Sequence, residues 1–245
     1  MTGFLQRNLA ASKKLKAKLA AGEVATLINS IHPSPSLVER LGEHGFDAVL
    51  IDAEHGSVGR DGVEEMARAA ALAGTAAIIR PEASLPHLIT GYFGCGVDGF
   101  MLPIIRGPEQ ARELVKWFRF SAPNDHADRV LILMIEHIEA VENLPALLAI
   151  EGVDAYLVAP GDLALSMGED LTRAQPSQRV HALMDQAIET IVRSGKVCGM
   201  CVHFDTVERF IGMGVRLLYI HTDHLLARGA TEYFSKVASG RRRAA

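Results

Sequence analysis

The chain has 245 residues, of which 49% are apolar and 22% are charged, and these proportions are ordinary for a globular protein. A formal net charge of −4 gives no broad positive charge for nucleic acid, so we expect no nucleic-acid partner. Three cysteines are too few for a disulfide framework and no apolar stretch is long enough to span a bilayer, so we expect a cytoplasmic protein without a membrane segment.

Apolar runs alternate with helical patterns along the chain. A helical pattern over residues 8–21 comes first. Eight runs then have the length and composition of buried parallel strands: 25–31, 48–52, 76–80, 99–104, 130–136, 155–159, 197–202 and 217–221. Amphipathic helices are predicted over 35–43, 63–73, 108–117, 141–149, 177–193 and 206–213, and a last helix over 224–238.

Eight strand–helix units in about 250 residues are typical of a (β/α)₈ TIM barrel. We therefore predict an α/β fold, a single barrel domain over residues 1–245 with an additional N-terminal helix. A doubly wound open sheet is the alternative, but such sheets usually have fewer strands.

Three local patterns suggest other functions, and we interpret each as structural. Residues 94–99 fit the dinucleotide-binding pattern GxGxxG, but a helix precedes them and a strand follows, which inverts the required context. Cys198 and Cys201 fit CxxC, but they fall within one strand, where residues three apart point to opposite faces. His221, near Asp223 and His224 at the end of the last strand, can line a barrel mouth, although a structural role is favoured.

Four predicted strands end at residues suited to chemistry. Asp52 and Arg80 end the second and third strands, Glu136 ends the fifth, and Asp162 follows the sixth. The carboxyl ends of parallel strands meet at one face, and ligands bind at that face in α/β folds. The sequence therefore predicts one site that contains all four side chains.

Glu136 and Asp162 form a pair of carboxylates that suits a hard divalent cation. Mg²⁺ or Mn²⁺ fits such oxygen ligands best, and Co²⁺ or Zn²⁺ is also compatible. The alternative is that both carboxylates are paired with Lys or Arg at the barrel rim. The residues alone leave these two interpretations nearly even.

The other polar residues can bind and deprotonate a substrate. Arg80 has a planar donor fork that can hold an oxyanion, although a salt bridge to one of the same carboxylates is an equal alternative. His55 can act as a general base if Asp52 or Glu54 orients its ring; alone, it would be interpreted as a loop or capping residue. The amides of Gly161 and Asp162 can bind a carboxylate, unless Gly161 is a plain turn glycine.

Together these residues indicate an aldol reaction. A metal and an arginine stabilise an enolate while a histidine moves a proton on an adjacent hydroxyl. No lysine ends a predicted strand near these groups, which argues against a Schiff-base aldolase. Metal-dependent aldol cleavage fits this set of residues best.

The sequence resembles the HpcH/HpaI aldolases along most of its length. The matching motifs are FDAVLIDAEH at 46–55, IRP at 79–81, GVDG at 96–99, LP at 102–103, IE at 135–136, EGVD at 151–154, PGDL at 160–163, SGK at 194–196, and Asp223 with the leucines at 225–226. The resemblance implies a (β/α)₈ barrel that uses a divalent metal to cleave 2-oxo-4-hydroxy acids into pyruvate and an aldehyde.

The resemblance also implies roles for individual residues. Glu136 and Asp162 would bind the metal, Arg80 would stabilise the pyruvate enolate, and His55 with Asp52 would form an acid/base dyad. The substrate carboxylate would meet the amides near Gly161. Its partners would be a small 2-oxo acid and an aldehyde, and the chain would form a homo-oligomer, a hexamer or a trimer.

Two departures from the family pattern carry further expectations. Only residues 121–129 connect the fourth barrel helix to the fifth strand, where family members have a long loop, so part of an active-site lid is expected to be missing. Met134 replaces a frequent glutamine and shares a strand face with Glu136, which would change the surroundings of the metal. A CoA-ester lyase, or a non-catalytic barrel that binds a 2-oxo acid, is the remaining alternative.

Overall fold

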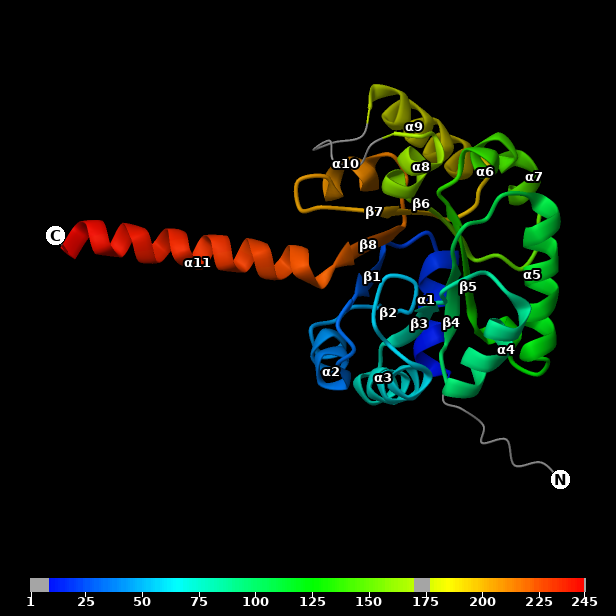
Figure 1. Cartoon of the computed structure of the whole chain (residues 1–245), viewed down its shortest axis with the longest axis horizontal. Helices are drawn as coiled ribbons and strands as arrows, with labels where there is room; N and C mark the ends of the chain where they lie inside the picture. The colour runs from blue at the N-terminus through cyan, green and yellow to red at the C-terminus, as the bar shows by residue number, and fades with distance from the viewer. Residues whose placement is uncertain (1–8, 170–176, 245) are drawn as a thin grey trace.

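The computed structural model describes residues 9–169 and 177–244 and contains a closed parallel β-barrel surrounded by helices (Figure 1). The strands follow chain order around the barrel, and the last pairs with the first. They are β1 (Ala25–Asn29), β2 (Ala48–Asp52), β3 (Ala76–Arg80), β4 (Gly99–Leu102), β5 (Val130–Ile135), β6 (Ala155–Val158), β7 (Cys198–Cys201) and β8 (Leu217–His221). The predicted (β/α)₈ TIM barrel is confirmed.

The helices begin and end where the local sequence favours it. Proline stands in the first turn of α2, α4, α5, α7 and α8, and the hydroxyl of Ser34 caps α2 through the N–H of Leu37. Gly74 and Gly96 end α3 and α4 in the left-handed conformation that glycine adopts without strain. The helical segments are α1 (Ala10–Ala20), α2 (Pro35–Glu43), α3 (Arg60–Ala73), α4 (Pro86–Cys95), α5 (Pro108–Ser121), η1 (His126–Asp128), α6 (Ile138–Glu142), α7 (Leu144–Leu148), α8 (Pro160–Ser166), α9 (Gln178–Arg193), α10 (Val207–Gly212) and α11 (Thr222–Ala244).

The barrel has two separate apolar cores because strand side chains alternate in direction. Alternate residues such as Ala48 and Leu50 fill the interior together with Leu15 and Leu19 of α1. Their neighbours, such as Val49 and Ile51, pack outward against the helices. Thus α1, the predicted N-terminal helix, closes the bottom of the barrel.

The segment 121–129 lies at that same bottom end. The hydroxyl of Ser12 in α1 donates a hydrogen bond to the carbonyl of Asp128 (2.7 Å), and the Nζ of Lys16 donates to the carbonyl of Arg129 (2.7 Å). The connection therefore precedes β5, whereas Glu136 follows it at the other end. The expectation that this short connection leaves part of an active-site lid missing does not hold within one chain, because the connection lies at the end of the barrel opposite Glu136.

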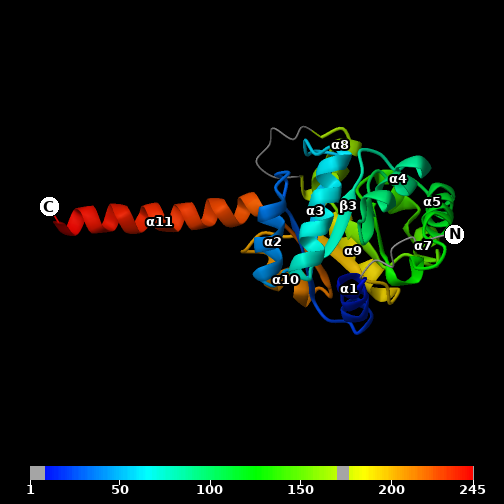
Figure 2. The same cartoon turned by 90° about the horizontal axis from the view of Figure 1, so that it is seen from below.

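The last helix is longer than predicted and extends away from the barrel (Figures 1 and 2). Leu226, Tyr233 and Phe234 on α11 are each at least 60% exposed. These side chains lack the burial that the apolar faces of the other barrel helices have. An amphipathic helix gains most of its stability from such packing. Within the described ranges, no helix is both long enough and apolar enough to cross a membrane.

Candidate active site

The inward-facing series of several strands ends at polar residues on the top rim of the barrel. In β2 the series Ala48, Leu50 ends at Asp52, and in β3 the series Ala76, Ile78 ends at Arg80. The same alternation places Glu136 after Met134 of β5 and His221 after Tyr219 of β8. These residues therefore converge because they continue the barrel interior into its mouth.

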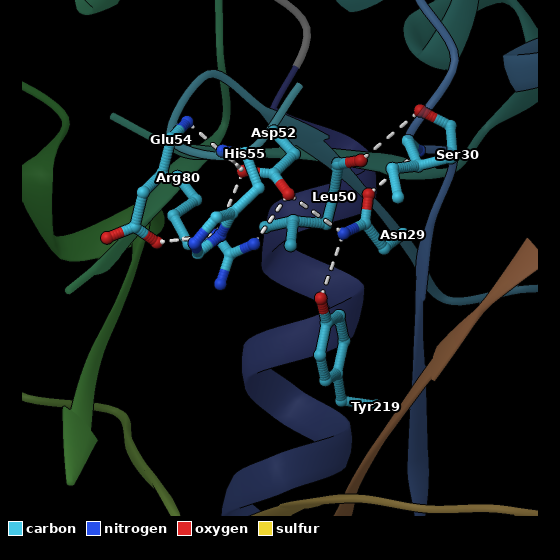
Figure 3. Close-up of polar contacts among 9 residues, drawn as sticks. Asn29, Ser30, Leu50, Asp52, Glu54, His55, Arg80 and Tyr219 are labelled. Carbon is cyan, nitrogen blue, oxygen red and sulfur yellow. Dashed lines mark hydrogen bonds and ion pairs between the residues drawn. The ribbon is translucent and has the colours of Figure 1, made fainter. Parts of the chain in front are cut away.

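Arg80 is held between two carboxylates (Figure 3). Asp52 and Arg80 are register partners on neighbouring strands, and Arg80 donates to Asp52 through Nε (2.9 Å) and Nη2 (2.5 Å). The Nε of Arg80 also lies 3.2 Å from the carboxylate of Glu54. Because Asp52 and Arg80 are both buried, this fork geometry fixes the guanidinium rather than leaving it mobile.

A hydrogen-bond chain extends this pair along the barrel wall through β1 to β8. The Nδ2 of Asn29 donates both to Asp52 (3.1 Å) and to the phenolic oxygen of Tyr219 (2.9 Å). Burial raises the pKa of Asp52, but the hydrogen bonds and charge of Arg80 outweigh it and hold this pKa below its usual range. Burial alone would lower the pKa of Arg80, yet Asp52 raises it, so the pair is ionised at neutral pH.

His55 lies on the loop after β2, with its ring more than half exposed. Asp52 accepts the backbone N–H groups of Glu54 (3.1 Å) and His55 (3.2 Å), which fixes the turn. The ring Nδ1 of His55 lies 3.4 Å from the carboxylate of Glu54. The structure thus joins Asp52 to the backbone of His55, and Glu54 to its ring.

Glu136 is buried at the end of β5, and its two oxygens have different surroundings. Oε1 accepts the backbone N–H of Ile104 (2.5 Å), whose φ of 53° is strained for a β-branched residue. Oε2 is buried and has no hydrogen-bond partner within the described residues. Burial, with the charges of Asp162 and Glu54, raises the pKa of Glu136 to about 7 although the Ile104 N–H opposes the change.

This part of the mouth has an excess of negative charge. Burial, together with the charges of Asp162 and Asp52, raises the pKa of Glu54 despite the opposing charges of Arg80 and His55. A buried carboxylate oxygen without a partner, close to other carboxylates, is costly unless the carboxylate is protonated or a cation reaches it. Within residues 9–169 and 177–244, no group of three or more His, Cys, Asp or Glu has metal-binding geometry. Glu136 and Asp162 are the residues that could hold a cation here, if water or substrate oxygens complete its shell.

Asp162 and Gly161 belong to the first turn of α8, a helix that the sequence analysis did not include. Amides in the first turn of a helix have no acceptor within it, so they face outward as donors. Both residues line the same cavity as His55 and Arg80. The predicted carboxylate-binding amides and the predicted catalytic side chains are thus brought to one place.

The cavity above these residues has a volume of about 630 Å³ and extends toward β7, β8 and α10. His203 and His221 line this cavity, so His221 faces the barrel mouth. The sequence had favoured a structural role for His221. The position of His221 at the end of a strand was the sequence signal for a place in the mouth, but no partner motif accompanied it. Met134 also lines the cavity, on the same side of β5 as Glu136, as the strand alternation predicts.

Comparisons with known proteins show the family of this chain. The sequence profile of the HpcH/HpaI aldolase/citrate lyase family matches residues 30–218. The chain is 31% identical over 213 residues to a hydroxypyruvate/pyruvate aldolase of Deinococcus radiodurans, covering 76% of each protein. It is 28% identical over 217 residues to a 4-hydroxy-2-oxo-heptane-1,7-dioate aldolase of Escherichia coli, covering 78% of this chain and 82% of that protein. In fold, it is similar to an HpcH/HpaI aldolase/citrate lyase family protein from Burkholderia cenocepacia, with a TM-score of 0.82, 23% identity, and coverage of 92% and 99%.

Proposed function

Because this chain belongs to the HpcH/HpaI aldolase/citrate lyase family and is a carbon–carbon lyase, we propose that it is a divalent-metal-dependent aldolase. Its substrates would be 4-hydroxy-2-oxo acids, and its products pyruvate, or a related 2-oxo acid, and an aldehyde. The observation that carries the metal is the buried Oε2 of Glu136, which has no partner in the described chain and lies among other carboxylates.

Glu136 and Asp162 would hold the cation, with Mg²⁺ or Mn²⁺ best suited to two carboxylates and water, and Co²⁺ or Zn²⁺ also compatible. Such a cation supplies positive charge for the oxygen that becomes negative during the reaction. Arg80 adds a second positive group. Its contacts to Asp52 and Glu54 use Nε and Nη2, so donors on Nη1 can reach a substrate oxygen.

In the cleavage direction, His55 takes the proton of the C4 hydroxyl while Glu54 steadies the imidazolium that forms. The C3–C4 bond breaks, the C4 oxygen keeps its bond as the aldehyde carbonyl, and the electron pair of the broken bond moves toward the C2 oxygen. Arg80 donates hydrogen bonds to the resulting enolate. His55 returns this proton to C3, directly or through water, which gives pyruvate and restores the neutral imidazole; the pyruvate carboxylate meets the amides of Gly161 and Asp162.

The assembly is part of the proposal. The exposed apolar residues of α11 need burial, and the helix extends from the barrel where a second copy can cover it (Figure 2). We therefore expect a homo-oligomer in which α11 packs against a neighbouring chain. Light scattering of the whole chain and of Tyr233→Ser/Phe234→Ser would test this, and a monomer in both cases would contradict it.

The activity is tested by pyruvate release from 4-hydroxy-2-oxo acids, followed with lactate dehydrogenase and NADH. We expect release with Mg²⁺ or Mn²⁺ and its loss in EDTA or in Glu136→Gln. Glu113→Gln is the matched control, because this glutamate is exposed on the outer helix α5. A full rate in EDTA, or in Glu136→Gln, would contradict the metal-dependent mechanism.

A further inference from the structure

Resting on the proposed function, we infer that the part of the cavity next to β7 and β8 is the aldehyde subsite and selects uncharged aldehydes with a flat apolar group, typified by aromatic aldehydes, over aldehydes that carry a second carboxylate. The inference comes from the side chains that line this part of the cavity and from the salt bridges that its arginines already make.

Flat rings form one wall of this subsite. His203, His221 and Tyr219 line the cavity. The ring centroids of Tyr219 and His221 lie 5.0 Å apart, and His224 backs the wall with its ring 4.3 Å from His203 and 5.4 Å from His221. Such an array offers ring faces and edges to a flat substituent, which stacks at comparable distances.

Apolar and polarizable side chains also line this part of the cavity. Met184 of α9, Phe210 of α10 and Met200 of β7 line the cavity and are almost fully buried. Thioethers adapt their shape to an aromatic ring and make favourable sulfur–ring contacts. Together with the imidazole wall, they form a slot that suits a ring better than a solvated, charged chain.

The cations of this cavity are already engaged. Among the described residues that line it, Arg80 is held by Asp52 and Glu54, and Arg209 is paired with both carboxylate oxygens of Asp185 (2.9 Å each). Burial and the neighbouring His224 lower the pKa of His221 to about 4, so its imidazole is neutral at pH 7. Burial and His203 also lower the pKa of His224.

A second carboxylate on the aldehyde would therefore lose water without gaining a free cation. That loss is costly in a partly enclosed, apolar site, whereas an uncharged ring gains from the same burial. The difference predicts selectivity at the acceptor and not at the pyruvate, which the charged side of the cavity binds.

The first test compares kcat/KM for benzaldehyde and for succinic semialdehyde in the aldol direction, with pyruvate and Mg²⁺. We expect benzaldehyde to be favoured at least tenfold. His203→Lys places an ammonium on the exposed edge of the ring wall and should shift this ratio at least tenfold toward succinic semialdehyde. His203→Gln is the matched variant without charge and should not raise the rate with succinic semialdehyde.

Asp185→Asn gives an independent test, because it frees Arg209 without changing the cavity wall itself. We expect this variant to shift the same ratio toward succinic semialdehyde. A wild-type preference for succinic semialdehyde would overturn the inference, and so would a ratio that neither His203→Lys nor Asp185→Asn changes.

Failure of the proposed function is separated by two measurements that need no aldol turnover. Exchange of the pyruvate methyl protons with D₂O reports enolate formation alone. Saturation-transfer NMR with benzyl alcohol reports occupation of the ring slot, which we expect to weaken at least tenfold in Phe210→Ala and in His221→Ala, and not in the exposed control Phe120→Ala. If exchange is absent but this pattern holds, the ligand class of the slot stands and the aldolase proposal falls. If benzyl alcohol binds equally to all four proteins, the inference is wrong whatever the exchange shows.

Discussion

The two sides of the cavity differ in how their polar groups are satisfied. On the side of β2, β3 and β5, Asp52, Glu54 and Glu136 surround the single guanidinium of Arg80. On the side of β7, β8 and α10, imidazole and aromatic rings and thioethers line the same space. The first side continues the inward positions of the strands, whereas the second also takes side chains from α9, α10 and the outward face of β7.

The difference teaches how chemistry and selectivity can be separated in one barrel. Charge that develops on a substrate must meet preorganised charge of the opposite sign, and the first side provides it. The part of a substrate that does not react needs only a matching shape and polarity, and the second side provides that. Substitutions on the first side should therefore lower every rate, whereas those on the second should change the ratio between substrates.

The largest expected effect is that of Glu136→Gln. Because this change removes a charged ligand from the proposed cation site, kcat/KM should fall about a thousandfold for every aldehyde. Steady-state kinetics with two aldehydes of different charge would check it. A loss confined to one aldehyde would break the division between the two sides.

Arg80→Lys should have the next largest effect. Lysine keeps the charge but loses the fork that binds Asp52 through two nitrogens, so we expect about a hundredfold loss of kcat/KM. Thermal unfolding of the variant is the necessary control, because Asp52 is buried and would lose its two-nitrogen contact with the guanidinium. Unchanged kinetics in a folded variant would contradict the role of Arg80.

The metal-free protein should lose stability as the pH rises. Burial raises the pKa of Glu136 to about 7, above its usual value, so its contribution to stability is complete below that usual value and is lost as the pH rises through the folded pKa. In EDTA, Glu136→Gln should therefore unfold at a higher temperature than the wild type near pH 8. The expected rise in Tm is about 2–4 °C for each kcal/mol by which the substitution increases the free energy of unfolding. A saturating divalent cation should reverse this order. Equal Tm values for the two proteins in EDTA at that pH would contradict the buried, unpartnered state of Glu136.

The smallest expected effect is that of Met134→Gln, at the border between the two sides. An amide beside Glu136 would bring polar contacts to the cation site and tighten Mn²⁺ binding by up to about tenfold. It would also bury a polar group in the barrel interior at a cost of about 1–3 kcal/mol. Calorimetric Mn²⁺ titration and urea unfolding would measure both. Weaker Mn²⁺ binding in a stable variant would show that the apolar neighbour is favourable.

Much of the site could be predicted from the sequence because strand alternation is strict. Once the strands are located, the positions of Asp52, Arg80 and Glu136 follow from counting by two along each strand. The strand boundaries of β2, β3 and β8 were predicted to the residue. The register of a closed barrel then brings these side chains together.

Other features depend on contacts that no local pattern records. The pairing of the His55 ring with Glu54 depends on a loop conformation. The direction of α11 depends on what it packs against. One helix was predicted where the structure has two short ones, α6 and α7, because Pro145 begins a new first turn. The short segment 121–129 was linked to a missing active-site lid because its length was considered without the direction of the strand that follows it.

The central claim is that Glu136 and Asp162 hold a divalent cation beside the enolate site. A crystal structure of the protein with Mn²⁺ and pyruvate tests it most directly, because manganese is identified by its anomalous scattering. We expect the manganese peak between these two carboxylates, with pyruvate bound next to it and its carboxylate at the amides of Gly161 and Asp162. A manganese ion bound elsewhere, or pyruvate bound in this cavity with Glu136 and Asp162 in contact with no cation, would contradict the account.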